Sequence, residues 1–100
     1  MKSIKAKELR EKLQNKEDFQ IIDIREPYEY EDGALCNENI PLDKMMTSID
    51  RISPNKPVVI YCQSGKRASA IIYMLEKEYN FNNLINLEGG YTTFMEEEYV

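Results

Sequence analysis

The chain has 100 residues and a formal net charge of −5, which fits one small domain and argues against nucleic-acid binding, because phosphate groups require a basic surface. No apolar stretch approaches the roughly 20 residues that span a bilayer, and no apolar signal-peptide segment follows the N-terminal lysines. We therefore expect a cytoplasmic protein, a monomer by default, without a nucleic-acid or membrane partner.

The sequence contains no histidine and two cysteines, Cys36 and Cys62. Without an imidazole, Cys–His and Ser–His catalysis and most zinc chemistry are excluded, so we expect no metal and no cofactor. The cysteines do not form a Cys-x-x-Cys pair, and a structural disulfide is not expected in a reducing compartment. A catalytic thiol in this chain therefore needs activation by groups other than histidine.

Strand and helix patterns alternate along the chain. Apolar, β-branched runs predict strands, and the clearest are 19–24 and 57–62. Weaker strand patterns lie at residues 3–4, 34–40 and 83–87. Apolar residues at helical spacing predict helices over 6–13, over 42–52 with Pro41 at its entry, over 68–79, and over 91–95 after the Gly89–Gly90 turn.

This alternation predicts one α/β domain over residues 1–100, with a mostly parallel sheet of about five strands and helices on both faces. Residues 57–62 carry no charge, so we expect that strand inside the sheet. Ligands of such folds bind beyond the carboxyl ends of the strands. Cys62 lies at one of these ends.

The segment "CQSGKRAS" joins this strand to the next predicted helix. Gly65 allows a sharp turn with positive φ, and the amides of a tight loop and of a helix N-terminus form a cradle for an anion. Lys66 and Arg67 add positive charge, which is unfavourable beside the positive end of a helix dipole unless an anionic ligand is bound. We therefore expect this loop to stabilise a Cys62 thiolate without histidine.

Other residues favour structural interpretations. A strand-end cysteine is more often a buried apolar residue than a nucleophile, and Cys36, which lacks the glycine and cations that follow Cys62, is predicted to be a packed thiol. Tyr28, Tyr30 and Tyr61 are predicted to be packing residues. The carboxylates of residues 26–32 are predicted to lie in a solvated turn and not in a metal site.

The loop resembles the active-site loop of the rhodanese-like family: Cys, two variable residues, Gly, one variable residue, Arg and a small residue. "IIDIREPYEYEDGALCNENIPL" (21–42) resembles the family's Asp-x-Arg, Glu-Tyr, Gly and Asn-Ile-Pro segment, and "LEGGYTTF" (87–94) resembles its Gly-Gly turn. The three blocks occur in the family's order. One departure is Ala34, where relatives commonly have histidine.

The resemblance implies a single-domain sulfurtransferase in which Cys62 becomes a persulfide. It implies a small-molecule sulfur donor and, as the acceptor, a thiol, cyanide or a protein. The donors that remain open are thiosulfate, a mercaptopyruvate-like acid, glutathione persulfide and a protein persulfide. Arg67 would help to hold an anionic donor, and Asp23, Arg25 and Ala68 would support the site. The loop that cradles the outer sulfur would consist of Gln63, Ser64, Gly65, Lys66 and Arg67.

Two alternatives stay open. A cysteine-dependent phosphatase or arsenate reductase uses a similar loop, but by resemblance its signature has five residues between Cys and Arg, whereas four separate Cys62 from Arg67. The shorter loop favours a sulfur atom over a phosphoryl group. A non-catalytic binding module of the same family is the second alternative, and the presence of Cys62 with a complete loop argues against it.

Overall fold

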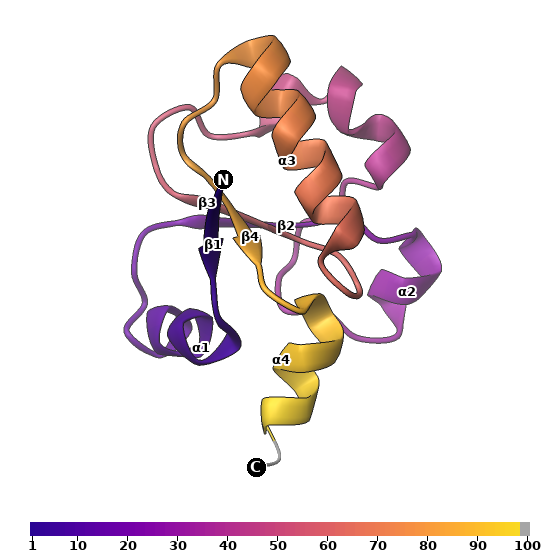
Figure 1. Cartoon of the computed structure of the whole chain (residues 1–100). Coiled ribbons are helices and arrows are strands. Elements are labelled where there is room, and N and C mark those ends of the chain that lie inside the picture. The colour runs from indigo at the N-terminus through magenta and orange to yellow at the C-terminus, as the bar shows by residue number, and fades with distance from the viewer. Residues whose placement is uncertain (99–100) are drawn as a thin grey trace.

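A parallel sheet forms the centre of the computed structural model, which describes residues 1–98 (Figure 1). Its strands are β1 (Lys2–Ile4), β2 (Gln20–Asp23), β3 (Val58–Tyr61) and β4 (Leu84–Leu87), in the spatial order β1-β4-β3-β2. All three strand pairings are parallel. The prediction that β3 lies inside the sheet is confirmed, because it pairs with β2 on one side and β4 on the other. The predicted domain, residues 1–100, includes residues 99 and 100, which lie outside the described residues.

Helices cover both faces of this sheet. They are α1 (Ala6–Gln14), α2 (Pro27–Glu31), the 3₁₀ helices η1 (Leu42–Thr47) and η2 (Ile49–Arg51), α3 (Lys66–Tyr79) and α4 (Gly90–Glu98). Helices α1 and α4 pack on one face, whereas α3 and the two 3₁₀ helices pack on the other. Within residues 1–98, no helix has both the length and the apolarity to cross a membrane.

Strand β3 explains why the sheet carries an apolar core on each side. Val58 and Ile60 point into the cluster under α3, and Val59 and Tyr61 point into the cluster under α1 and α4. Each of the four side chains is fully buried. Since successive strand residues face opposite sides, a strand covered on both faces needs the unbroken apolar run that predicted it.

The prediction of a strand over 34–40 is wrong, so the sheet has four strands and not about five. This segment meets β2 only at one isolated bridge, between Asp23 and Asn39. The Asn39 side chain donates to the carbonyl oxygens of Asp23 (2.8 Å) and Arg25 (3.0 Å). Pro41 then follows, and it has no N–H with which to continue a ladder.

The prediction of one helix over 42–52 is also wrong, because two 3₁₀ helices occupy the segment. Ser48 separates them with a non-helical backbone (φ −124°, ψ 28°), and the Thr47 hydroxyl donates to the Lys44 carbonyl at 3.1 Å. Short polar side chains compete in this way with helical hydrogen bonds.

The segment 26–32, predicted as a turn, contains helix α2, which starts at Pro27. Glu29 Oε1 caps this helix by accepting a hydrogen bond from the Glu26 N–H at 2.9 Å.

Candidate active site

Cys62 directly follows β3, and its side chain is fully buried at the carboxyl end of the sheet. Its Sγ accepts hydrogen bonds from the N–H groups of Gly65 (3.1 Å) and Ala68 (3.4 Å). Gly65 is the N-cap of α3 and has φ +97°, which confirms the predicted positive φ. Both amides thus belong to the start of a 14-residue helix, where N–H groups lack helical partners and the helix dipole favours negative charge.

Helix α4 holds the other side of this loop. The Tyr91 N–H donates to the Cys62 carbonyl (2.9 Å), and the Thr92 N–H donates to the Gln63 carbonyl (3.0 Å). Gly90 makes this approach possible: its φ is +61°, and a Cβ atom there would lie 2.5 Å from the Cys62 oxygen and 2.7 Å from the Gln63 oxygen. The sequence indicated a Gly-Gly turn, but nothing in the local pattern placed it against the loop of Cys62.

A buried ion pair between Asp23 and Arg25 lies beside the loop. Arg25 Nη2 is 2.7 Å from Asp23 Oδ2, Arg25 Nε is 3.1 Å from both carboxylate oxygens, and the Tyr61 hydroxyl donates to Oδ2 at 2.7 Å. The exposed fractions of the Asp23 and Arg25 side chains are 0% and 2%. Burial alone lowers the pKa of Arg25, but the hydrogen bond and charge of Asp23 outweigh it and raise that pKa.

Arg25 connects this pair to the loop. Its Nη1 donates to Gln63 Oε1 at 3.1 Å, and Gln63 Nε2 donates to the Thr92 hydroxyl at 2.8 Å. The guanidinium also lies 4.2 Å from the centre of the Tyr91 ring. Among the described residues, no hydrogen bond joins Asp23 or Arg25 to Cys62 Sγ. The supporting role predicted for both residues stays a prediction, and their position beside the loop favours it.

The segment around Ala34 is held without the histidine of the relatives. The Gly33 carbonyl accepts a bond from Arg25 Nη2 (2.6 Å), and the Leu35 N–H donates to the Tyr61 hydroxyl (2.9 Å). The Ala34 side chain is exposed. These two hydrogen bonds use the backbone groups of Gly33 and Leu35 and do not involve the Ala34 side chain.

Arg67 pairs with a carboxylate that sequence reasoning missed. Its Nη1 and Nη2 lie 3.2 and 3.3 Å from the two carboxylate oxygens of Glu29 on α2, a fork-to-fork arrangement. This hydrogen bond lowers the pKa of Glu29 and raises the pKa of Arg67, and Cys62 adds a smaller upward shift to the pKa of Arg67. The other polar loop side chains, Ser64 and Lys66, are exposed.

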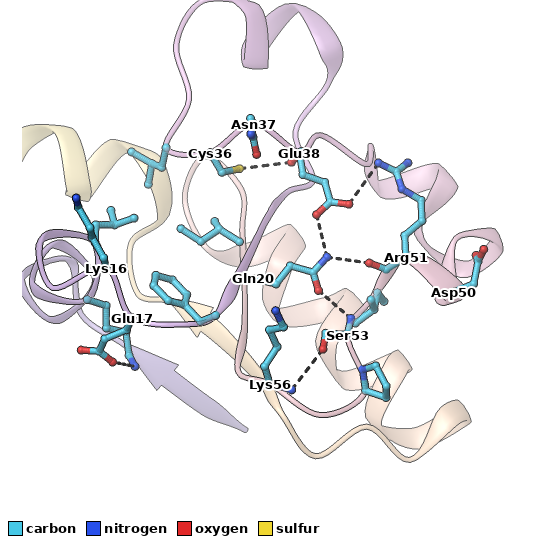
Figure 2. A pocket seen from close by; sticks show the side chains of 17 residues that line it. Lys16, Glu17, Gln20, Cys36, Asn37, Glu38, Asp50, Arg51, Ser53 and Lys56 are labelled. Carbon is cyan, nitrogen blue, oxygen red and sulfur yellow. Dashed lines mark hydrogen bonds and ion pairs between the residues drawn. The ribbon is translucent and has the colours of Figure 1, made fainter.

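Cys36 lies on the opposite face of the sheet from Cys62, in the cluster under α1 and α4. Its thiol donates to the Glu38 carbonyl (3.4 Å), and burial raises its pKa, in agreement with a packed thiol. The residue lines a cavity of about 670 Å³ that is bordered by α1, the start of β2, the segment 35–38 and residues from the segment 50–56. Figure 2 shows Gln20 crossing that cavity, with its amide bonded to Glu38 and Arg51.

This cavity is a weaker candidate than the loop, although it is large. Neither Cys62 nor any residue of its loop lines it. Its central polar side chain, Gln20, is satisfied by the protein itself, since Gln20 Oε1 also accepts the Ser53 N–H at 2.8 Å. Chemistry favours the loop, where two amides converge on one sulfur atom.

Comparisons with known proteins identify the family of the chain. The sequence profile described as Rhodanese-like domain matches residues 5–97. A protein named Sulfurtransferase from Allochromatium vinosum is 32% identical over 89 residues, covering 87% of this chain and 81% of the relative. Protein YqhL from Bacillus subtilis is 37% identical over 73 residues, covering 72% of this chain but only 57% of the relative. The crystal structure of a rhodanese-like domain protein from Staphylococcus aureus superposes with a TM-score of 0.85 at 32% identity, covering 94% of this chain and 91% of the other.

Proposed function

The chain belongs to the rhodanese-like domain family, and we propose that it is a sulfurtransferase that carries sulfur on Cys62. A relative named Sulfurtransferase supports sulfur transfer in general. One observation carries the proposal: the Cys62 sulfur accepts two amide hydrogen bonds at the N-terminus of α3. These donors stabilise negative charge on sulfur without a general base, and the chain has no histidine to act as one.

The proposed reaction has two steps. First, the Cys62 thiolate attacks the outer sulfur of a donor and forms a new S–S bond with it. The bond between that sulfur and the rest of the donor breaks, and its electron pair leaves with the rest of the donor. With thiosulfate, the products are sulfite and a Cys62 persulfide anion. A thiolate or cyanide then attacks the outer persulfide sulfur, takes it, and returns the electron pair to Cys62. No oxidant or reductant is consumed.

The loop amides serve both steps, because they stabilise the Cys62 thiolate that attacks in the first step and is released in the second. Cys62 has no exposed area, so a donor reaches Sγ only when the side chains around the loop move. The proposed partners are a small-molecule sulfur donor and a thiol, cyanide or protein acceptor.

Mass spectrometry tests the proposal. After incubation with a sulfane donor, we expect the protein to gain one sulfur atom, which cyanide or a reducing thiol removes. Cys62→Ser should abolish the gain and the turnover. Cys36→Ser is the matched control, because it removes the other thiol on the opposite face of the sheet, and it should leave turnover nearly intact.

The same mass measurement, made with other substrates, would identify the alternatives. A phosphorylated Cys62 after incubation with an aryl phosphate would favour the phosphatase. A Cys62 that takes sulfur from none of thiosulfate, an organic persulfide and mercaptopyruvate would favour the binding module.

A further inference from the structure

One of the two positive charges of the loop, that of Arg67, is paired with a carboxylate from a second element. Both terminal nitrogens of Arg67 face Glu29, whose carboxylate side chain is only 19% exposed. Glu26, at the N-cap of the same helix, also raises the pKa of Arg67. Arg67 thus faces the carboxylate of Glu29 with that of Glu26 nearby, whereas the exposed Lys66 makes no described hydrogen bond or ion pair.

This arrangement has consequences for the donor. A dianion such as thiosulfate must approach a Cys62 thiolate, so its oxygens need positive charge close by. The exposed Lys66 supplies a point charge but no planar pair of donors. The planar fork of Arg67 is suited to an oxyanion, but Glu29 already occupies it. A persulfide group contains no oxyanion and does not need that fork. Its reaction needs only the Cys62 thiolate, which the backbone amides of Gly65 and Ala68 stabilise.

We propose that Glu29 determines donor specificity: by holding Arg67, it disfavours oxyanion donors such as thiosulfate and leaves the site selective for sulfur carried on a thiol, that is, an organic persulfide. This inference rests on the sulfurtransferase function proposed above. The preferred step is balanced: the Cys62 thiolate attacks the outer sulfur of R–S–S⁻, the donor S–S bond breaks, R–S⁻ leaves with the electron pair, and Cys62 keeps the sulfur as a persulfide anion.

The role of Glu29 in donor choice can be separated from its role in α2. Glu29 Oε1 also accepts the Glu26 N–H, and glutamine fills the same capping position. Glu29→Gln therefore removes the charge that holds Arg67 and keeps the cap. Glu31→Gln is the matched control: it removes the same charge from the same helix, and the Glu31 side chain is exposed and makes no described hydrogen bond or ion pair.

The experiment compares two donors, thiosulfate and 2-hydroxyethyl persulfide, in steady-state transfer to cyanide. In Glu29→Gln, kcat/KM for thiosulfate should rise about fivefold, the size of one partly exposed charge interaction, mainly through a lower KM. With the persulfide donor, kcat/KM should stay within about twofold, since no oxyanion contact is involved. Glu31→Gln should change neither donor.

A second substitution tests whether Arg67 is the group that Glu29 holds. In the Glu29→Gln background, Arg67→Ala should remove the thiosulfate gain, whereas in the wild-type background it should have a smaller effect on thiosulfate. This non-additivity is the expected mark of two residues that act on the donor as a pair. The measurement remains informative if Glu29→Gln is less stable, because the ratio of the two donors is taken within each variant.

The outcomes separate the inference from the function on which it rests. If Cys62 takes sulfur but Glu29→Gln changes both donors equally, or lowers the use of thiosulfate, Glu29 only shapes the loop and the inference is wrong. If Cys62 takes sulfur from neither donor in the wild type, the sulfurtransferase function itself fails. A thiosulfate-specific gain that requires Arg67 supports both.

Discussion

Replacing Gly90 with alanine tests whether the contact between α4 and the loop positions the nucleophile. The new Cβ would lie 2.5 Å from the Cys62 carbonyl oxygen, whereas ordinary contact begins at 3.4 Å, so α4 or the loop must move by about 0.9 Å. The left-handed backbone at φ +61° adds a strain of about 1–2 kcal/mol for any residue with a side chain. Overpacking against rigid backbone adds about 1–3 kcal/mol.

We therefore expect Gly90→Ala to lower the free energy of unfolding by about 2–5 kcal/mol, measured by urea denaturation. A displacement near 1 Å at a reacting atom can cost about 100-fold in rate, so loading of Cys62 with sulfur should slow by that order. Quenched mass spectrometry at a fixed donor concentration measures this rate.

Asn80→Ala is the matched control for Gly90→Ala. Asn80 also has a left-handed backbone, at φ +59°, but it ends α3, about 20 Å along the helix from the loop. Its replacement should cost about 1 kcal/mol through backbone strain and leave sulfur loading unchanged. If Gly90→Ala loses no more stability than Asn80→Ala and loads sulfur at the wild-type rate, α4 does not position the loop, and the reasoning is refuted.

Two further predictions concern the charged groups around the site. Asp23→Asn should lower the free energy of unfolding by about 3–5 kcal/mol in urea titrations, because it leaves the Arg25 guanidinium buried without its counter-charge. A loss below about 1 kcal/mol would contradict a tightly coupled pair. For the partly buried pair of Glu29 and Arg67, Arg67 lowers the pKa of Glu29. The contribution of this pair to stability should therefore be complete above pH 4.5, the ordinary value for this group, and should disappear as the pH falls through the lowered value. Urea midpoints measured from pH 6 downward should consequently fall more steeply in the wild type than in Glu29→Gln, and parallel curves would show that the pair contributes nothing.

Local patterns predicted much of the fold because their causes are local. The apolar run at 57–62 requires burial on both faces, which places it inside a sheet, and Gly65 supplies the positive φ that a strand-to-helix turn needs. In the segments predicted wrongly, 34–40 and 42–52, short polar side chains bond to the backbone. Such bonds depend on which carbonyl the folded chain brings within reach, and apolar periodicity does not report them.

The sequence by itself determined that Cys62 ends an inner strand and is followed by a turn of amides and cations, because those residues are contiguous. Only the tertiary structure decided what surrounds them. Glu29 reaches Arg67 across 38 positions of sequence, and Gly90 brings α4 against the Cys62 carbonyl. Neither partner has a local signature, since a glutamate in a helix or a glycine in a turn has the same pattern wherever the fold places it. The amount of positive charge that the loop offers to a donor is therefore a property of how α2 packs on α3.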